Sequence, residues 1–442
     1  MFMKKIIVLT LSIIQLQFIF AQAPEWSKDK TIYEVNIRQY TPEGTFDAFA
    51  THLPRLEKMG VGILWMMPIQ PIGELNRKGS LGSYYSISDY TATNPEFGSL
   101  KDFKKLVDEA HKRDMHVILD WVANHTSWDH VWMKKHPDFY TTDKSGKVIP
   151  PVADWSDVAD LNYDNKAMRA AMIEDMKYWV KEADIDGFRC DVAMMVPDDF
   201  WKEAFTELRK IKPDIFLLAE AEGPQFHSDG FNMTYAWNKH HIMNEIAKGT
   251  MTADTMDVAI QKDLKNYTAD SYFMNFTSNH DENSWNGTEY EKYGDLAVPL
   301  AVFSCMWNGI PLIYGGQELP NHKRLQFFDK DQIEWAGHPA LHDFYKKLLL
   351  LRKQQPALLS GHKDVITWRI ATDHPDELFC FVRKNKEHEA VIVLNFSNRE
   401  INFQLHDLRV RGEFKNEFTG KLNEISADFH IEPWGYLVMT KQ

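Results

Sequence analysis

The feature that most constrains the fold of this 442-residue chain is a repeated alternation of short apolar segments with stretches of helical periodicity. The apolar segments are rich in β-branched and aromatic residues and are bounded by turn residues, as expected of strands buried on both faces. Eight such repeats favour an α/β fold with a closed (β/α)8 TIM barrel over an open doubly wound sheet, which stays open as the alternative. The eight segments are IYEVNI (32–37), VGILWM (61–66), HVILDWV (116–122), IDGFRCDV (185–192), IFLLAE (215–220), MTYAW (233–237), YFMNFT (272–277) and PLIYGG (311–316).

Two departures from the even repeat indicate additional parts. The link from the third apolar segment to the helical stretch 168–183 is long and rich in His, Asp, Trp and Pro, which predicts a small inserted subdomain. After the predicted helix 340–355, short alternating stretches such as AVIVLNF are separated by turns, which is typical of an antiparallel β-sandwich. We therefore predict a signal peptide (1–21), a barrel (22–125 and 166–358), an inserted subdomain B (126–165) and a C-terminal β-sandwich domain (359–442).

The N-terminus has the pattern of an export signal. Lys4 and Lys5 precede an apolar run that polar residues interrupt, and a small residue, Ala21, follows it. The run is too short and too interrupted for a comfortable membrane span, so we favour a secretory signal over the alternative of an N-terminal anchor. A cysteine close to the cleavage point, which a bacterial lipid anchor needs, is missing. We expect an exported protein, periplasmic or secreted after cleavage, with no stable membrane insertion.

Composition excludes several classes of function. Lys and Arg number 50 against 63 Asp and Glu, and a net charge of −13 argues against a nucleic-acid partner, which needs a basic surface. Three scattered cysteines are too few for a disulfide scaffold or a cysteine metal site. The 14 tryptophans suit a core, and their flat rings also suit the apolar faces of sugars.

Polar side chains gather where the predicted strands end, which in such barrels is where functional residues lie. Carboxylates from three strand ends that face one mouth would repel one another and raise one another's pKa. A site that needs one carboxylic acid and one carboxylate at neutral pH would use that repulsion. For any one of these Asp residues taken alone, the alternative to a functional role is that it caps a helix or accepts a hydrogen bond within a loop. The strand-end residues are Asp120, Asn124, His125, Arg189, Asp191, Glu220, Glu222, Asn279, His280 and Asp281.

These segments resemble a known family. DWVANH (120–125), GFRCD (187–191), LLAE (217–220) and FTSNHD (276–281) resemble, in order, the four signature regions of the α-amylase family of glycoside hydrolases, glycoside hydrolase family 13. YYSISDYTATNPEFGSLKDF (84–103) and VADLNYD (158–164) resemble further segments of it. The resemblance covers essentially the whole mature chain. It implies a (β/α)8 barrel, a subdomain after strand three and a C-terminal β-sandwich, in agreement with the layout above.

The resemblance implies three catalytic carboxyl groups: Asp191 as nucleophile, Glu220 as general acid/base and Asp281 as transition-state stabiliser. A retaining glycosidase needs an ionised nucleophile and a protonated acid about 5–5.5 Å apart. Arg189 precedes Asp191 by two residues, so both point to one side of a strand and its charge should keep Asp191 ionised. Glu222 shares a strand face with Glu220, and the family pattern selects Glu220.

The resemblance also implies substrate-binding residues. His125 and His280 are placed to hydrogen-bond sugar hydroxyls, and Tyr85 matches the position whose ring packs against the sugar being cleaved. Arg189 belongs to the same predicted substrate-binding set. For the histidines a structural hydrogen bond remains the alternative, and for Tyr85 simple core packing.

A structural calcium ion is a further implication. Asn124 and Asp160 match family positions that bind calcium between the barrel and the inserted subdomain, and hard oxygen ligands suit this ion. A backbone carbonyl shortly after Asp191 is the other family ligand. The alternative is an Asn and an Asp that hold the loop by hydrogen bonds.

The sequence departs from the family pattern at two places near the sugar. The run DVAMMVP has Met194 and Met195 where many members have Lys-His, and Ser86 replaces an Asp that often follows the stacking Tyr. We expect a retaining hydrolase of α-1,4-glucosidic bonds in starch-like glucans or maltooligosaccharides. A transglycosylase, an α-glucosidase or neopullulanase-type enzyme on short α-glucosides, and a non-catalytic glycan-binding protein are the alternatives.

Overall fold

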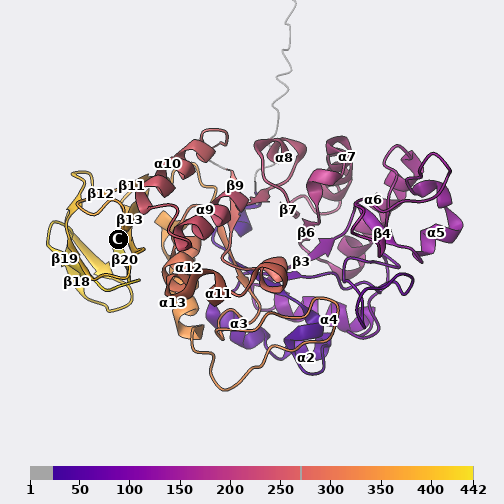
Figure 1. The fold of residues 1–442 in the computed structure, drawn as a ribbon, viewed down its shortest axis with the longest axis horizontal. Helices are drawn as coiled ribbons and strands as arrows, with labels where there is room; N and C mark the ends of the chain where they lie inside the picture. Colours follow the sequence, from indigo (N-terminus) through magenta and orange to yellow (C-terminus); the bar gives the residue numbers. More distant parts are fainter. Residues whose placement is uncertain (1–22, 269–270, 442) are drawn as a thin grey trace, which may run out of the picture.

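A closed parallel barrel forms the centre of the molecule (Figure 1). The computed structural model describes residues 23–268 and 271–441, so the predicted signal peptide, 1–21, lies outside the described residues. Each predicted apolar segment forms one barrel strand. The strands are Ile32–Val35 (β1), Ile63–Met66 (β2), His116–Trp121 (β3), Gly187–Cys190 (β6), Phe216–Ala219 (β7), Met233–Tyr235 (β8), Tyr272–Asn275 (β9) and Ile310–Tyr314 (β10).

The barrel closes between its first and last strands. Neighbours follow the order β1-β10-β9-β8-β7-β6-β3-β2, and β1 pairs in parallel with both β2 and β10. Ile32 lies opposite Ile63 on one side and Leu312 on the other. Closure leaves no barrel edge unpaired, so the open doubly wound sheet is excluded.

Alternate residues along the strands fill the barrel interior, as the two-residue period of a strand requires. This buried cluster consists of Ile32, Ile63, Trp65, Ile118, Phe216, Leu218, Met233, Tyr235, Tyr272, Met274, Phe276, Ile310 and Leu312. The same period places Glu34, Asp120 and Arg189 on the inner face, nearer the carboxyl ends of their strands, and all three are buried. A layer of buried polar side chains therefore lies between the apolar interior of the barrel and its mouth at the carboxyl ends of the strands.

Helices surround the barrel (Figure 1). Helix Leu100–His111 (α4) begins with a capping box, because Ser99 and Asp102 each accept the other's backbone N–H. Within residues 23–268 and 271–441, no helix has both the length and the apolar character needed to cross a bilayer. The other helices are Ile37–Tyr40 (α1), Phe46–Ala50 (α2), Leu53–Met59 (α3), Val131–Lys135 (α5), Lys166–Ala183 (α6), Asp198–Arg209 (α7), Pro224–Asp229 (α8), Trp237–Ala247 (α9), Ala253–Leu264 (α10), Glu289–Tyr293 (α11), Ala297–Met306 (α12) and His342–Gln354 (α13).

The segment between β3 and α6 contains a small antiparallel pair, His125–Ser127 (β4) and Val158–Asp160 (β5), with α5 between them. Figure 1 shows this segment at the opposite end of the molecule from the C-terminal strands. β4 begins only four residues after β3 ends, so the strand pair lies close to the end of β3. The inserted segment therefore borders the barrel mouth.

The C-terminal part is an antiparallel sandwich with its own core. Its main sheet joins Ile366–Arg369 (β11), Leu378–Asn385 (β13), His388–Asn395 (β14), Tyr436–Lys441 (β20), Glu413–Asn416 (β17) and Leu422–Glu424 (β18), in that order. Two smaller sheets pair Ala371–Thr372 (β12) with Leu405–His406 (β16), and Ile401–Phe403 (β15) with Phe429–Ile431 (β19). Phe303 and Trp307 at the end of α12 pack against Phe379 and Phe381 of β13, so an aromatic contact joins the sandwich to the barrel.

Candidate active site

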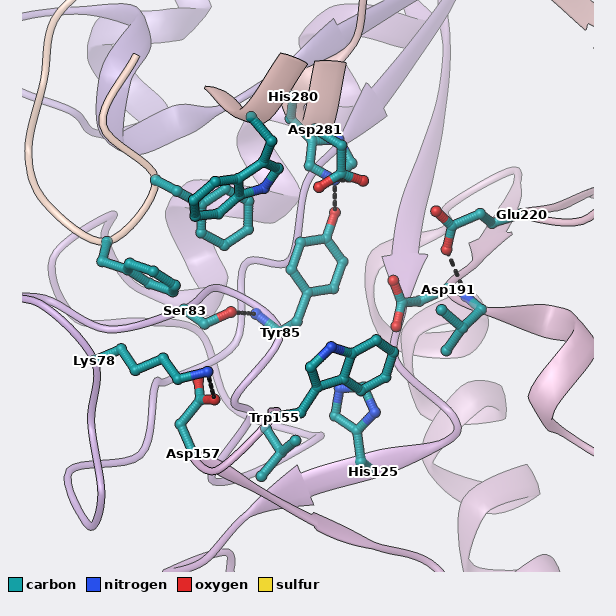
Figure 2. Close-up of a pocket in the computed structure, with 15 residues that line it drawn as sticks. Lys78, Ser83, Tyr85, His125, Trp155, Asp157, Asp191, Glu220, His280 and Asp281 are labelled. Atoms are coloured by element: carbon teal, nitrogen blue, oxygen red, sulfur yellow. Dashed lines mark hydrogen bonds and ion pairs between the residues drawn. The ribbon is translucent and has the colours of Figure 1, made fainter. Parts of the chain in front are cut away.

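A pocket of about 460 Å³ opens at the carboxyl ends of the barrel strands (Figure 2). Six of the residues predicted for the site line this pocket. They are Tyr85, His125, Asp191, Glu220, His280 and Asp281. The structure therefore brings the three predicted catalytic carboxyl groups together with three of the four predicted substrate-binding side chains.

Arg189 lies beneath the pocket and connects the carboxylates. Its Nη1 donates to Asp120 Oδ1 at 2.8 Å and to Asp191 Oδ1 at 3.0 Å. Its Nη2 lies 2.9 Å from Glu220 Oε1 as an ion pair, and the guanidinium is fully buried. One guanidinium thus contacts both predicted reacting carboxyls.

The glycine of GFRCD explains how β6 and β7 approach closely enough for this contact. A Cβ on Gly187 would lie 1.9 Å from the carbonyl oxygen of Phe216 on β7, so a larger residue would push the strands apart. Asp191 follows β6 directly and Glu220 follows β7 directly. The close strand pairing therefore sets the two carboxyls side by side, as Figure 2 shows.

The residue after Asp191 adds a hydrogen bond to Glu220. The backbone N–H of Val192 donates to Glu220 Oε2 at 2.6 Å. Val192 has a φ of +37°, in the left-handed region that costs a β-branched residue about 1–3 kcal/mol. The strained backbone aims this N–H at the predicted acid/base.

Burial and the neighbouring Glu220 raise the pKa of Asp191, and the opposing charge of Arg189 does not outweigh them. The prediction that Arg189 alone keeps Asp191 ionised is therefore wrong in the absence of substrate. Burial likewise raises the pKa of Glu220, with Asp281 adding to it and Arg189 opposing it. Because the two carboxyls titrate together, the pair retains a proton to higher pH than isolated carboxyls do.

His280 and Asp281 form a second charged pair beside the first. His280 Nδ1 lies 2.5 Å from Glu34 Oε1, and its Nε2 lies 3.2 Å from Asp281 Oδ2. Burial alone would lower the pKa of His280, but the charges of Asp281 and Glu34 outweigh it and raise the pKa well above its usual value. Burial opposes ionisation of Asp281, yet His280 outweighs this and lowers its pKa. Asp281 is therefore held as a carboxylate at neutral pH.

Tyr85 comes from the loop between β2 and α4 and lines the same wall. Its hydroxyl donates to Asp120 Oδ2 at 3.0 Å and lies 2.8 Å from His280 Nε2. Its ring stacks 6.2 Å from Phe327. The side chain therefore links the two charged groups and presents a ring to the pocket.

Several residues at the site have no role assigned from the sequence. Asp120 is fully buried and also accepts a hydrogen bond from Trp65 Nε1 at 3.1 Å, so it fixes Arg189 from below. Glu34 orients His280, and its only sequence signal is a charge inside an apolar strand segment. Trp155, Phe327 and Phe328 add aromatic surface from loops, and Trp285 adds it from the short helix Glu282–Asn286.

The other predicted residues have clear positions. Glu222 accepts a hydrogen bond from Asn238 N at 2.9 Å, whereas Glu220 lines the pocket. Met194 and Met195, which replace Lys-His, are 53% and 39% exposed just past Val192.

Asn124 directly precedes β4 and lies close to Asp160, the last residue of β5. Asp160 is opposite His125 in the register, and Leu161 N donates to Asn124 O at 3.2 Å. Burial raises the pKa of Asp160, an effect that a bound cation would reverse. A half-buried carboxylate next to a buried amide is donor chemistry that fits a hard cation. The described residues also include an exposed group with metal-binding spacing on the sandwich, Glu400, His430 and Glu432.

The family model described as the α-amylase catalytic domain matches residues 18–147 and 152–336. The chain belongs to the α-amylase family. An α-amylase from Lactobacillus plantarum is 29% identical in sequence with a TM-score of 0.84, covering 94% of this chain and 99% of that one. A maltogenic α-amylase from Thermotoga neapolitana is 28% identical with a TM-score of 0.86 and the same coverage. An α-amylase from Haloarcula japonica is 26% identical over 391 residues, 85% of this chain, which spans only 56% of that relative's length.

Proposed function

We propose that this member of the α-amylase family is a retaining glycoside hydrolase that cleaves α-1,4-glucosidic bonds in starch-like glucans or maltooligosaccharides. The observation that supports this best is the contact of one buried guanidinium, that of Arg189, with both Asp191 and Glu220 at the pocket floor. A retaining site needs two carboxyl groups at short separation in different protonation states. The coupled pair meets that need, because mutual repulsion keeps one proton on it.

In the proposed reaction, Glu220 gives its proton to the glycosidic oxygen while an oxygen of Asp191 attacks the anomeric carbon. The bond from that carbon to the leaving oxygen breaks, and the shorter glucan departs with the proton. The carboxylate of Asp281 stabilises the positive charge that develops on the sugar ring. A water molecule then enters and gives one proton to Glu220. The water oxygen attacks the anomeric carbon and breaks its bond to Asp191, so the configuration is retained overall.

Binding of the reacting sugar would use the wall that faces these carboxyls. The ring of Tyr85 offers an apolar face to the sugar, and the two histidines offer hydrogen bonds to its hydroxyls. His125 lies with its ring centroid 5.5 Å from that of Trp155, so an aromatic edge borders its imidazole.

A proton NMR time course with maltoheptaose tests the proposal. Wild type should first release the α-anomer of the new reducing end, and Asp191→Asn should not. The distribution of product lengths separates transfer to sugar from transfer to water. First appearance of the β-anomer, or near-full activity of Asp191→Asn, would contradict it.

We also propose that Asn124 and Asp160 hold a structural calcium ion. The ion would join the end of β3 to the inserted segment and would offset the burial cost of Asp160. Chelation by EDTA should lower the melting temperature of wild type, and added calcium should restore it. Asp160→Ala should melt lower and be indifferent to EDTA; a wild-type curve that ignores EDTA would refute the site.

We also propose that the protein is exported, to the periplasm or outside the cell, and that its signal peptide is cleaved near Ala21. The support is the basic and apolar pattern of residues 1–21. N-terminal sequencing of protein recovered outside the cytoplasm should begin close to Gln22. A retained Met1 on the exported protein would contradict cleavage.

A further inference from the structure

The proposed reaction gives the pocket a direction. Glu220 protonates the leaving oxygen, so the departing part of the glucan lies on the side of Glu220 and the retained sugar lies on the opposite side. Figure 2 shows Glu220 at one end of the pocket and Lys78 with Asp157 at the other, with Tyr85 between them. The far end is therefore where the non-reducing end of the substrate has to go.

An ion pair spans that far end. Lys78 Nζ lies 3.0 Å from Asp157 Oδ1, and it also donates to the carbonyl oxygen of Asp154 at 2.9 Å. The Asp157 side chain is 7% exposed and the Lys78 side chain 33% exposed. Lys78 belongs to the loop after β2 and Asp157 to the segment before β5, so the pair joins two separate loops across the pocket end.

Ser86, one of the departures from the family pattern, fixes one side of this ion pair. Its hydroxyl donates to the carbonyl oxygen of Asp157 at 3.0 Å, and the side chain is buried. A carboxylate at this position would face that carbonyl without a hydrogen to donate. The replacement of Asp by Ser is thus compatible with the backbone position that the ion pair needs.

A third loop braces the Lys78 side. Leu81 N donates to the carbonyl oxygen of Phe328 at 3.0 Å, and Ser80 N donates to Asp329 Oδ1 at 2.8 Å. Gly79 has a φ of +63°, and a Cβ there would lie 2.4 Å from Cβ of Phe328. The loop that carries Lys78 is therefore packed tightly against the loop after β10, and three loops enclose the far end.

We propose that the Lys78–Asp157 ion pair closes the pocket at the non-reducing side, so that the enzyme acts on chain ends and releases a short sugar of fixed length. The inference rests on the proposed function, because that function sets the direction of the substrate. The volume of about 460 Å³ lies in the lower half of the range of about 300–1,000 Å³ for small-molecule sites. Both charged groups face the pocket, where they meet the hydroxyls of the terminal sugar.

Two maltoheptaosides with the same chromophore at the reducing end test this. One has a free non-reducing end. In the other, an acetal joins the 4- and 6-hydroxyls of the sugar at the non-reducing end and so blocks that end. Wild type should cleave the free substrate to one short sugar and its labelled remainder. It should cleave the blocked substrate at least about 10-fold more slowly, since one added group in a close-fitting pocket discriminates by about 10–200-fold.

Three variants complete the test. Lys78→Ala opens the far end of the pocket. The rate on the free substrate divided by the rate on the blocked substrate should therefore fall at least threefold, and products of mixed length should appear. Lys78→Arg keeps the ion pair and should retain the wild-type ratio of the two rates and a single product length. Lys144→Ala, which removes an exposed lysine of the inserted segment, should behave as wild type. Equal rates on both substrates, or a Lys78→Ala variant with the wild-type ratio, would overturn the inference. Failure to cleave the free substrate would instead overturn the proposed function, and this inference with it.

Discussion

Arg189→Met is the substitution whose effect follows most directly from the structure. It removes a fully buried cation and leaves a side chain of similar length. The carboxylates of Asp120, Asp191 and Glu220 lose a partner at 2.8–3.0 Å. We expect the variant to fold at acid pH, to lose stability as the pH rises, and to lose nearly all activity.

The magnitude can be worked from the distances. At an effective dielectric constant of about 20, unit charges about 3 Å apart interact by about 5 kcal/mol, or about 4 pKa units. Three carboxylates share the guanidinium and water can enter the space, so we expect the pKa of each reacting carboxyl to rise further, by less than this full pairwise interaction. At high pH the uncompensated charges should cost about 3–5 kcal/mol of unfolding free energy.

The sign of the pH dependence is fixed by linkage. A carboxyl whose pKa is raised in the folded state contributes stability that is fully present below its unfolded pKa, about 4, and is lost as pH rises through the folded value. Burial and Glu220 already raise the pKa of Asp191 in wild type, and the variant should raise it further. The gap in melting temperature between wild type and variant should therefore widen from pH 4 upward.

Thermal unfolding of wild type and variant between pH 4 and pH 9 measures this gap. Arg352→Met is a matched control, because Arg352 is equally buried but donates to the carbonyl oxygens of Cys305 and Gly309 and to Ser360 Oγ. Its loss of stability should not depend on pH. A gap for Arg189→Met that is constant across pH would refute the electrostatic reasoning.

Three further predictions concern single side chains. Tyr85→Phe keeps the ring but removes the hydroxyl that donates to Asp120, so we expect kcat to fall with KM nearly unchanged, and a loss of about 1.5–3 kcal/mol in urea unfolding; a raised KM with unchanged kcat would contradict this. His280 has a raised pKa, so its contribution to stability is fully present below about pH 6.5 and is lost as pH rises through the raised value. The melting-temperature deficit of His280→Gln should therefore shrink at high pH, and a deficit that grows would refute it. Burial raises the pKa of every thiol, so a disulfide exchange reagent should react only after denaturation with Cys190, Cys305 and Cys380.

The sequence was sufficient to predict the barrel, and the physical reason is visible in its strands. Parallel strands covered on both faces must be apolar along their whole length, so each of the eight leaves a short apolar run that turn residues end. The two-residue period then indicated that Arg189 and Asp191 share a side, and the structure places Asp191 Oδ1 3.0 Å from Arg189 Nη1. The strands are shorter than predicted, because backbone pairing ends before the apolar runs do.

The contacts between the loops that form the walls of the site could not be predicted from the sequence. Glu34 contacts His280 across 246 positions of the chain, and the loop that holds Phe327 reaches Tyr85 only once the barrel is closed. Lys78 and Asp157 lie in loops with no periodicity, so nothing in either loop indicates the other. Contacts of this kind depend on how the closed barrel positions its loops, whereas strand-end residues depend mainly on local pattern.

Trapping of the covalent intermediate tests the central claim most directly. A 5-fluoro-α-glucosyl fluoride slows both formation and hydrolysis of the sugar–enzyme bond, so the intermediate should accumulate. Intact mass spectrometry should show one added fluoroglucosyl group, and peptide mapping should place it on Asp191 in wild type but find none in Asp191→Asn. A label on Asp281 or Glu220, or turnover of the reagent by Asp191→Asn at the wild-type rate, would contradict the account.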